Sequence, residues 1–229
     1  MKSNLIFVIF IPLLFLSCLE KSGSNLERPY DLSVSEGFQN PLGFHDSMPS
    51  FSWKLPKTSA VKKQNAYSIV LASAPDLLPD SPDVWSSGKV MSNQSVFVKY
   101  TGNPLKSRQK IYWQVCYWGS ENSVSDWSEI SSIEMGLLSN ADWKAKWIKI
   151  PDPKVWDTTR YGTRLFRPQY LRKAFNIDAD IKKARLYITS KGVFKPYING
   201  AKITEDVLTP GWTPYRKRLE TLTYDVTEA

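Results

Sequence analysis

One continuous stretch, residues 184–218, constrains the fold of this chain more than any other part of the sequence. It reads ARLYITSKGVFKPYINGAKITEDVLTPGWTPYRKR. Leu186 and Ile188 alternate with more polar side chains, which is the periodicity of a half-buried β-strand. Asn199 and Gly200 stand between two short apolar runs, and this pair is a strong signal for a tight β-hairpin because both residues tolerate the positive φ that such turns need. The stretch therefore predicts antiparallel β-structure.

The preceding part of the chain has the same character. Aromatic residues make up 13% of the chain, and they fall in short alternating runs separated by Pro, Gly and Ser, a composition typical of all-β proteins. About seven such runs in roughly a hundred residues indicate an immunoglobulin-like or fibronectin type III sandwich over residues 29–136. We expect its strands at residues 31–34, 51–55, 66–73, 85–90, 95–100, 111–117 and 130–135.

The region after this sandwich predicts a second β-rich module, residues 143–229. Alternating apolar residues indicate strands at residues 170–177, 186–191, 193–198 and 219–226. Residues 151–168 contain Pro151, Pro153 and Pro168 and show little alternation. We therefore expect a long loop there.

Several motifs occur in a fixed order along both modules. They are PSFSW at residues 49–53, WSSGKV at 85–90, YWQV at 112–115, WKAKWI at 143–148 and the long stretch 184–218. In this order they resemble the N-terminal accessory modules of bacterial α-L-rhamnosidases. The resemblance implies an all-β fold, in which a fibronectin type III or immunoglobulin-like sandwich is followed by the first part of a second, jelly-roll-like β-sandwich.

The same resemblance carries an expectation about function. In that family the corresponding region precedes a large helical barrel that holds the catalytic carboxylates. The resemblance therefore implies the non-catalytic N-terminal part of a glycoside hydrolase that releases terminal L-rhamnose. Its second module is expected to be incomplete, and a missing C-terminal catalytic domain is its expected partner. The chain would serve as membrane anchor, spacer and substrate-side module.

The carboxylates of the chain agree with a non-catalytic role. Glycoside hydrolysis by the usual route needs two positioned carboxylates, and the adjacent Glu205 and Asp206 would point to opposite sides of an extended chain. We expect no catalytic residue, no metal site and no cofactor, and no activity of the chain by itself. Two alternatives stay open: a non-catalytic cell-surface glycan-binding lipoprotein, and a β-sandwich module for protein interaction.

The N-terminus has the features of an export signal. Lys2 precedes an apolar run at residues 5–16, and about 12 apolar residues are too few to cross a bilayer, which needs roughly 20. We expect residues 1–17 to be a signal peptide. The small residue before Cys18 resembles a bacterial lipobox, which implies a lipid anchor on Cys18, a tether at residues 18–28 and an exported lipoprotein of the cell envelope, periplasmic or at the cell surface. An ordinary secretory signal, with Cys18 incidental, is the alternative.

Charge is distributed unevenly along the chain. The 30 Lys and Arg against 22 Asp and Glu give a net charge of +8, and the excess lies in residues 143–229, which carry 18 against 9. A basic module attracts an acidic polysaccharide, an anionic membrane surface or nucleic acid. No nucleic-acid motif is present, so we expect no nucleic-acid partner. Solvated strand faces, or a surface that meets an acidic partner domain, are the simpler interpretation.

The remaining residues with distinctive chemistry are isolated in the sequence. Cys116 lies within an apolar run and is expected to be a buried thiol. It has no disulfide partner if Cys18 is acylated. His45, the single histidine, lies in a loop-like segment and is expected at the surface.

Sugar binding is a further candidate function for the end of the stretch 184–218. Sugar sites combine aromatic side chains with a few placed polar groups. Trp212 and Tyr215 lie on a segment rich in Pro and Gly, with Asn199 and Arg218 near in sequence. These four residues are candidate contacts for a rhamnose-containing glycan. The alternative is that Trp212 packs inside the sandwich or against another domain.

Overall fold

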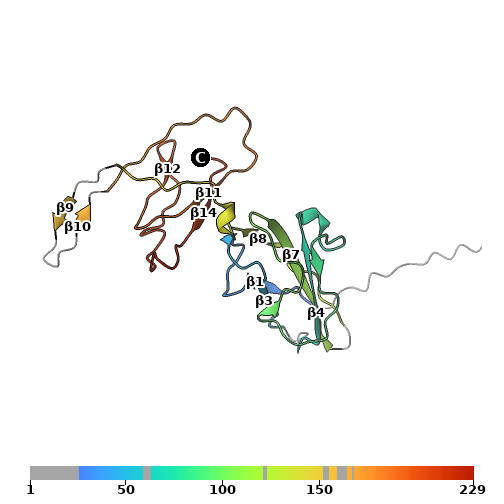
Figure 1. Cartoon of the computed structure of the whole chain (residues 1–229). Helices are drawn as coiled ribbons and strands as arrows, with labels where there is room; N and C mark the ends of the chain where they lie inside the picture. The colour runs from blue at the N-terminus through green and yellow to red at the C-terminus, as the bar shows by residue number, and fades with distance from the viewer. Residues whose placement is uncertain (1–25, 59–62, 121–122, 152–154, 159–163, 167) are drawn as a thin grey trace, which may run out of the picture.

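The computed structural model describes residues 26–58, 63–120, 123–151, 155–158, 164–166 and 168–229. Within these residues the regular elements are β-strands and two 3-10 turns, η1 (Pro75–Leu77) and η3 (Asn140–Asp142). The all-β class expected from the sequence is confirmed. Figure 1 shows two lobes joined by the segment around η3. The expected signal peptide and Cys18 lie outside the described residues.

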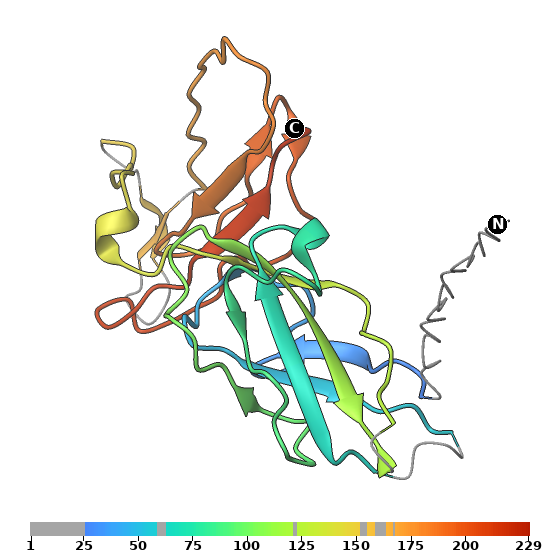
Figure 2. The same cartoon turned by 90° about the vertical axis from the view of Figure 1, so that its right-hand side faces the viewer.

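The first lobe is a sandwich of two sheets. One sheet has the order β1-β3-β6, and the other has the order β2-β8-β7-β4-β5. The strands are β1 (Tyr30–Val34), β2 (Leu42–Phe44), β3 (Ser50–Lys54), β4 (Ala66–Ala72), β5 (Trp85–Ser86), β6 (Val98–Lys99), β7 (Lys110–Trp118) and β8 (Ser131–Met135). Antiparallel pairing joins β4 to β7 along the whole of β4, and these are the two long central strands in Figure 2. The immunoglobulin-like sandwich is therefore confirmed.

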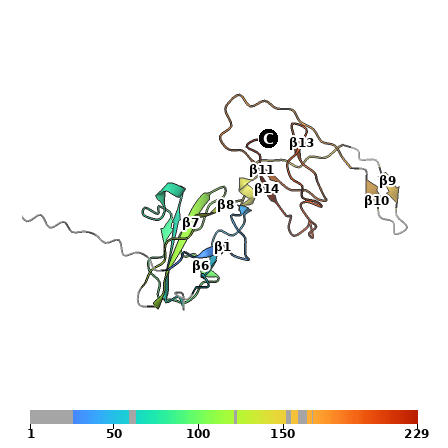
Figure 3. The ribbon, with the colours of Figure 1, turned by 180° about the vertical axis from the view of Figure 1, so that it is seen from behind.

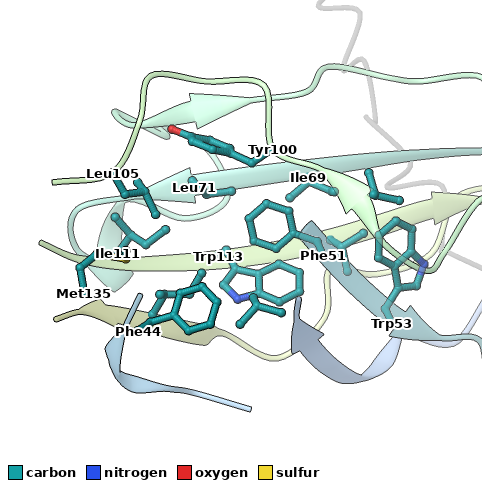
Figure 4. Close-up of a cluster of buried hydrophobic side chains, with 14 of the residues drawn as sticks. Phe44, Phe51, Trp53, Ile69, Leu71, Tyr100, Leu105, Ile111, Trp113 and Met135 are labelled. Atoms are coloured by element: carbon teal, nitrogen blue, oxygen red, sulfur yellow. The ribbon is translucent and has the colours of Figure 1, made fainter. Parts of the chain in front are cut away.

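The core of this sandwich follows from the alternation in the sequence. Ile111, Trp113 and Val115 of β7 point inward and are completely buried. Phe51 of β3 enters from the opposite sheet, and its ring centroid lies 4.6 Å from that of Trp113. Figure 4 shows Phe51, Ile111 and Trp113 between the two sheets. Burial of several large aromatic side chains supplies the main driving force for folding of this domain.

The sandwich differs from the expected strand pattern in two respects. Strand β2 is not among the predicted strands, and it lies parallel to β8. It has only three residues and includes Gly43, so its sequence carries no alternation that could be recognised. The expected strands 85–90 and 95–100 shorten to β5 and β6, because the backbone takes positive φ at Gly88 (61°) and Phe97 (53°).

The second lobe is built from strand pairs. Strand β11 (Arg185–Ile188) pairs antiparallel with β14 (Leu222–Asp225). Strand β12 (Tyr197–Ile198) forms a hairpin with β13 (Ala201–Lys202). Its turn residues Asn199 and Gly200 have φ of 51° and 84°, as the Asn-Gly pair predicts. The hairpin and both strands of the β11–β14 pair are confirmed, whereas the expected strand at residues 193–198 shortens to the two residues of β12.

Two expectations for the second lobe are wrong. The expected loop at residues 151–168 contains the hairpin of β9 (Val155–Thr158) and β10 (Arg164–Phe166), which lies apart from the rest of the lobe in Figures 1 and 3. The prolines flank these strands rather than interrupt them. The expected strand at residues 170–177 is irregular and exposed, with Tyr170 at 95% and Phe175 at 70%. Alternation alone does not make a strand, because a strand also needs a neighbour for its backbone hydrogen bonds.

Candidate functional site

A loop near the C-terminal end of the chain presents the sugar-binding candidate Trp212. We call residues 208–218 the Trp loop. Its first anchor is a reciprocal pair of hydrogen bonds: the Phe194 amide donates to the Thr209 carbonyl at 2.8 Å, and the Thr209 hydroxyl donates to the Phe194 carbonyl at 3.0 Å. Thr209 is buried. These two hydrogen bonds therefore hold the first residues of the Trp loop in place.

The second anchor of the Trp loop follows Trp212. The Gly192 amide donates to the Tyr215 hydroxyl at 2.9 Å. The hydroxyl of buried Thr213 donates to the Arg218 carbonyl at 2.7 Å. Trp212 thus lies between two held segments, yet 82% of its surface is exposed. A large apolar ring is presented to solvent on a backbone that is tied at both sides.

The four sugar-binding candidates have separate surroundings. Trp212 faces solvent, whereas the hydroxyl of Tyr215 is used to hold the loop. Asn199 occupies the turn between β12 and β13. The guanidinium of Arg218 forms an exposed ion pair with Glu220 at 3.1 Å. Of the four, Trp212 is the residue that presents an exposed aromatic ring.

Two further cations lie on the Trp loop. Arg216 and Lys217 are exposed, and the described residues include no ion-pair partner for either. They place unneutralised positive charge beside Trp212 in the chain, which favours a ligand with anionic groups. The excess of Lys and Arg in residues 143–229 is the sequence signal that could have pointed to them.

A second arrangement of charges, not anticipated from the sequence, joins the two lobes. Glu134 of β8 is nearly buried, and its carboxylate accepts hydrogen bonds from Nε and Nη2 of Arg185 at 2.8 and 3.0 Å. The Lys183 ammonium lies 2.8 Å from the same carboxylate. Asp225 of β14 contacts Nη1 of Arg185 at 2.7 Å. We call these four residues the interlobe cluster.

The pKa of Glu134 reflects two opposing causes. Burial desolvates the carboxylate, which by itself raises the pKa, but hydrogen bonds from Arg185 and Lys183 together with their positive charges outweigh burial and lower it. The pKa of Asp225 is lowered first by the Thr227 hydroxyl and then also by Arg185. Both groups are held as carboxylates, which suits ion pairing and does not suit a proton donor.

Other contacts surround the interlobe cluster. A Cβ at Gly43 of β2 would come within 2.5 Å of the Thr223 hydroxyl on β14, so only glycine permits this approach. The Arg108 guanidinium lies over the Tyr187 ring at 5.7 Å. The Ser107 hydroxyl donates to Asp142 in the connecting turn η3 at 2.5 Å. Two further segments of the first lobe, at Gly43 and at residues 107–108, therefore contact the second lobe or the segment leading to it.

Comparison with known proteins assigns both lobes. The family model for the Rha78A-like N-terminal immunoglobulin domain matches residues 29–139. The family model for the α-L-rhamnosidase N-terminal domain matches residues 179–229. An α-L-rhamnosidase of Formosa agariphila is 50% identical over 97% of the chain. The chain carries the N-terminal domains of the α-L-rhamnosidase family.

Further relatives agree with this assignment. An α-L-rhamnosidase of an Alteromonas species is 46% identical over 96% of the chain. The solved α-L-rhamnosidase from Dictyoglumus thermophilum matches 89% of the chain with a TM-score of 0.79 and 36% identity. The chain spans about a quarter of the length of each of these relatives, namely 24%. It corresponds to their N-terminal domains, which we call the Ig-like domain (29–139) and the rhamnosidase N-terminal domain (179–229).

The rhamnosidase N-terminal domain also has a small cavity beside its β12–β13 hairpin. Its volume of about 50 Å³ suits one or two water molecules and no sugar ring. Glu205 at its edge is paired with Lys202 at 3.0 Å, and Asp206 accepts a hydrogen bond from the Tyr224 hydroxyl at 3.5 Å. The two adjacent carboxylates thus have separate structural partners.

Other candidate groups behave as isolated residues. Cys116 on β7 is buried, as expected, and burial raises the pKa of its thiol to about 12. His45 is exposed beside β2. Over the part of the chain that the structure describes, no three His, Cys, Asp or Glu side chains come together in a way that could hold a metal ion. That part also contains no helix with the length and hydropathy of a membrane span.

Proposed function

We propose that the chain is the non-catalytic N-terminal part of an α-L-rhamnosidase, a glycoside hydrolase that releases terminal L-rhamnose. The observation that carries this proposal is the match of nearly the whole chain to the N-terminal quarter of α-L-rhamnosidases at up to 50% identity. Glu134 and Asp225 have carboxyl pKa values lowered by their partners, whereas a general acid for glycoside hydrolysis needs a raised one.

The rhamnosidase N-terminal domain supports a role beside a further domain. Large apolar side chains are exposed on it and on the segment that precedes it, among them Tyr170 at 95%, Val207 at 73% and Leu208 at 75%. Apolar surface of this extent is typical of a face that contacts protein. We propose that a C-terminal catalytic domain packs against this region.

The test of this proposal compares the native protein with the chain alone. An antibody against the Ig-like domain is expected to detect, in membranes of the source cells, a band several times heavier than 26.2 kDa. The immunoprecipitate should hydrolyse p-nitrophenyl α-L-rhamnopyranoside, whereas the purified chain should not. A single native band near 26 kDa without activity would contradict the proposal.

Membrane anchoring forms a second part of the proposal. A lipid on Cys18 would tether the protein to the cell envelope, on the periplasmic or outer side, and the sequence before Cys18 supports this. The Ig-like domain would then be the spacer between the anchor and the domains that follow.

Glycan binding is a second candidate function, and it rests on the Trp loop. Trp212 is 82% exposed although the segments on both sides of it are hydrogen-bonded. A preorganised aromatic surface binds with a smaller loss of conformational entropy, and a pyranose ring would stack on it. A rhamnose-containing glycan is the proposed ligand, with Arg216 and Lys217 available for its polar or anionic groups.

A further inference from the structure

The interlobe cluster has the geometry of a specific lock. Two nitrogens of Arg185 meet two carboxylate oxygens of Glu134 at 2.8 and 3.0 Å, and this fork-like pairing fixes orientation as well as distance. The Arg185 side chain is only 11% exposed, and the Glu134 side chain is only 5% exposed. An ion pair shielded in this way is weakly screened by salt.

We propose that Glu134 and Arg185 lock the Ig-like domain and the rhamnosidase N-terminal domain in one relative orientation. The Ig-like domain is then a rigid brace for the following domain and not a flexible spacer. Relative motion is the default for neighbouring domains unless a large apolar interface prevents it. In this protein, directional polar contacts between the two domains would prevent their relative motion instead.

Charge complementarity across the joint supports the lock. Glu134 is the member of the interlobe cluster contributed by the Ig-like domain, and Lys183, Arg185 and Asp225 come from the other domain. The charges are also paired the other way round: Lys110, a cation of the Ig-like domain, lowers the pKa of Asp225 in the other domain. Each domain therefore supplies charges of both signs to the joint. Separation of the domains would leave Glu134 without its two cationic partners.

Contacts outside the cluster restrict rotation about it. A single ion pair permits its two domains to swivel, whereas separated contacts remove this freedom. Gly43 packs closely on Thr223, and Arg108 lies over Tyr187. These contacts are small, so the buried Glu134–Arg185 pair is the one whose loss should release the joint. Removal of one partner leaves a buried charge uncompensated.

Distances between spin labels, measured by pulsed electron resonance on the full chain, test the lock. Labels would be placed by Met91→Cys on the Ig-like domain and Val193→Cys on the other, since these side chains are 73% and 66% exposed. Cys18→Ser removes a competing thiol, and Cys116 is buried with a raised pKa, so it should not react. A narrow distance distribution is expected, and Glu134→Gln should broaden it about twofold because the uncharged amide no longer holds Arg185.

Arg185→Gln provides an independent variant, because it leaves the Ig-like domain unchanged. It should broaden the distribution less than Glu134→Gln does, because Lys183 still pairs with Glu134. The double variant should broaden it no further than Glu134→Gln alone, since that single change already removes both pairs across the joint. The matched control is Glu220→Gln, which breaks the exposed Arg218–Glu220 pair and should leave the distribution narrow. Circular dichroism establishes that each variant is folded.

A broad distribution in the parent chain would overturn the proposal, and so would narrow distributions in both folded single variants. The readout is purely geometric. Its outcome is therefore independent of whether the protein acts on rhamnose.

Discussion

Thr209 and Phe194 exchange two hydrogen bonds, at 2.8 and 3.0 Å, across 15 positions of the chain. The pair fixes the start of the Trp loop and so determines how Trp212 meets solvent. Thr209 is buried, and its hydroxyl has Phe194 as its partner. The side chain most exposed to a ligand is thus positioned by one of the least exposed residues of its domain.

Glycan binding should depend on Trp212 and on this anchor. Trp212→Ala is expected to abolish binding of a rhamnose oligosaccharide, measured by titration calorimetry, because the stacking surface is lost. Trp212→Phe should retain part of the binding, because a smaller aromatic ring remains. Thr209→Val keeps the shape of the side chain but removes the hydroxyl donor, so it should weaken binding and lower stability by about 1 kcal/mol. Unchanged affinity in Trp212→Ala would show that the ring serves another purpose.

The two buried indoles of the Ig-like domain should respond differently to the same substitution. Nε1 of Trp53 donates to the buried Gln64 side chain at 3.0 Å, whereas Nε1 of Trp113 has no hydrogen-bond partner among the described residues. Trp53→Phe leaves Gln64 Oε1 without its donor, so it should cost about 1–3 kcal/mol more than Trp113→Phe. Chemical unfolding followed by near-UV circular dichroism measures both. Equal losses of unfolding free energy in the two variants would mean that packing, and not the hydrogen bond to Gln64, determines the cost.

Acid should loosen the joint between the domains. The pKa of Glu134 is lowered in the folded protein, since Arg185 and Lys183 outweigh the opposing effect of burial. The carboxylate therefore contributes stability that is complete above its ordinary pKa of 4.5 and is lost as the pH falls through the lower folded value. Thermal melts from pH 7 downward are expected to show this loss. Glu134→Gln should flatten the profile in that range, and an unchanged profile would contradict the assignment.

The thiol of Cys116 should be inert in the folded protein. Its side chain is 2% exposed and its pKa is raised to about 12 by burial, so little of the nucleophilic thiolate is present at neutral pH. In a Cys18→Ser chain, a thiol reagent such as DTNB should react only after denaturant is added. Rapid reaction in native buffer would show that β7 opens readily.

Acylation of Cys18 can be checked in cells. A strain fed radiolabelled palmitate is expected to label the protein and to lose the label in the Cys18→Ala variant, because the thiol is the proposed attachment site. The matched control is Cys116→Ala, which should retain the label. Secretion of an unlabelled parent protein into the medium would favour an ordinary secretory signal.

The sequence was most informative where its pattern reports a local requirement. The alternation of Ile111, Trp113 and Val115 predicts a buried strand face, and Asn199–Gly200 predicts a tight turn. Both succeed because period and turn geometry are properties of neighbouring residues. The family motifs extended this reading to the order of the domains.

Long-range relationships were beyond such reasoning. Glu134 and Arg185 are 51 positions apart, and nothing in either local sequence marks one as the partner of the other. Strand β2 and the β9–β10 hairpin were missed because short strands carry no periodicity. Residues 170–177 show the opposite failure, since they alternate but pair with no strand in the part of the chain that the structure describes. The sequence therefore offered Trp212 as a candidate ligand contact, but it gave no sign of the hydrogen bonds that hold the Trp loop.

Leu26 has a consequence for how the protein would stand on a membrane. It is 4% exposed and bridges to Ser125, and the Tyr117 hydroxyl donates to the carbonyl of the next residue, Glu27, at 3.0 Å. The start of the described chain is thus fastened to the Ig-like domain at its end remote from the other domain (Figure 1). For a protein held at Cys18, the Ig-like domain would begin about eight positions (26 − 18 = 8) after the attachment site, because Leu26 already packs against that domain. If Glu134 and Arg185 hold the two domains in one orientation, both would then move as one body relative to the membrane.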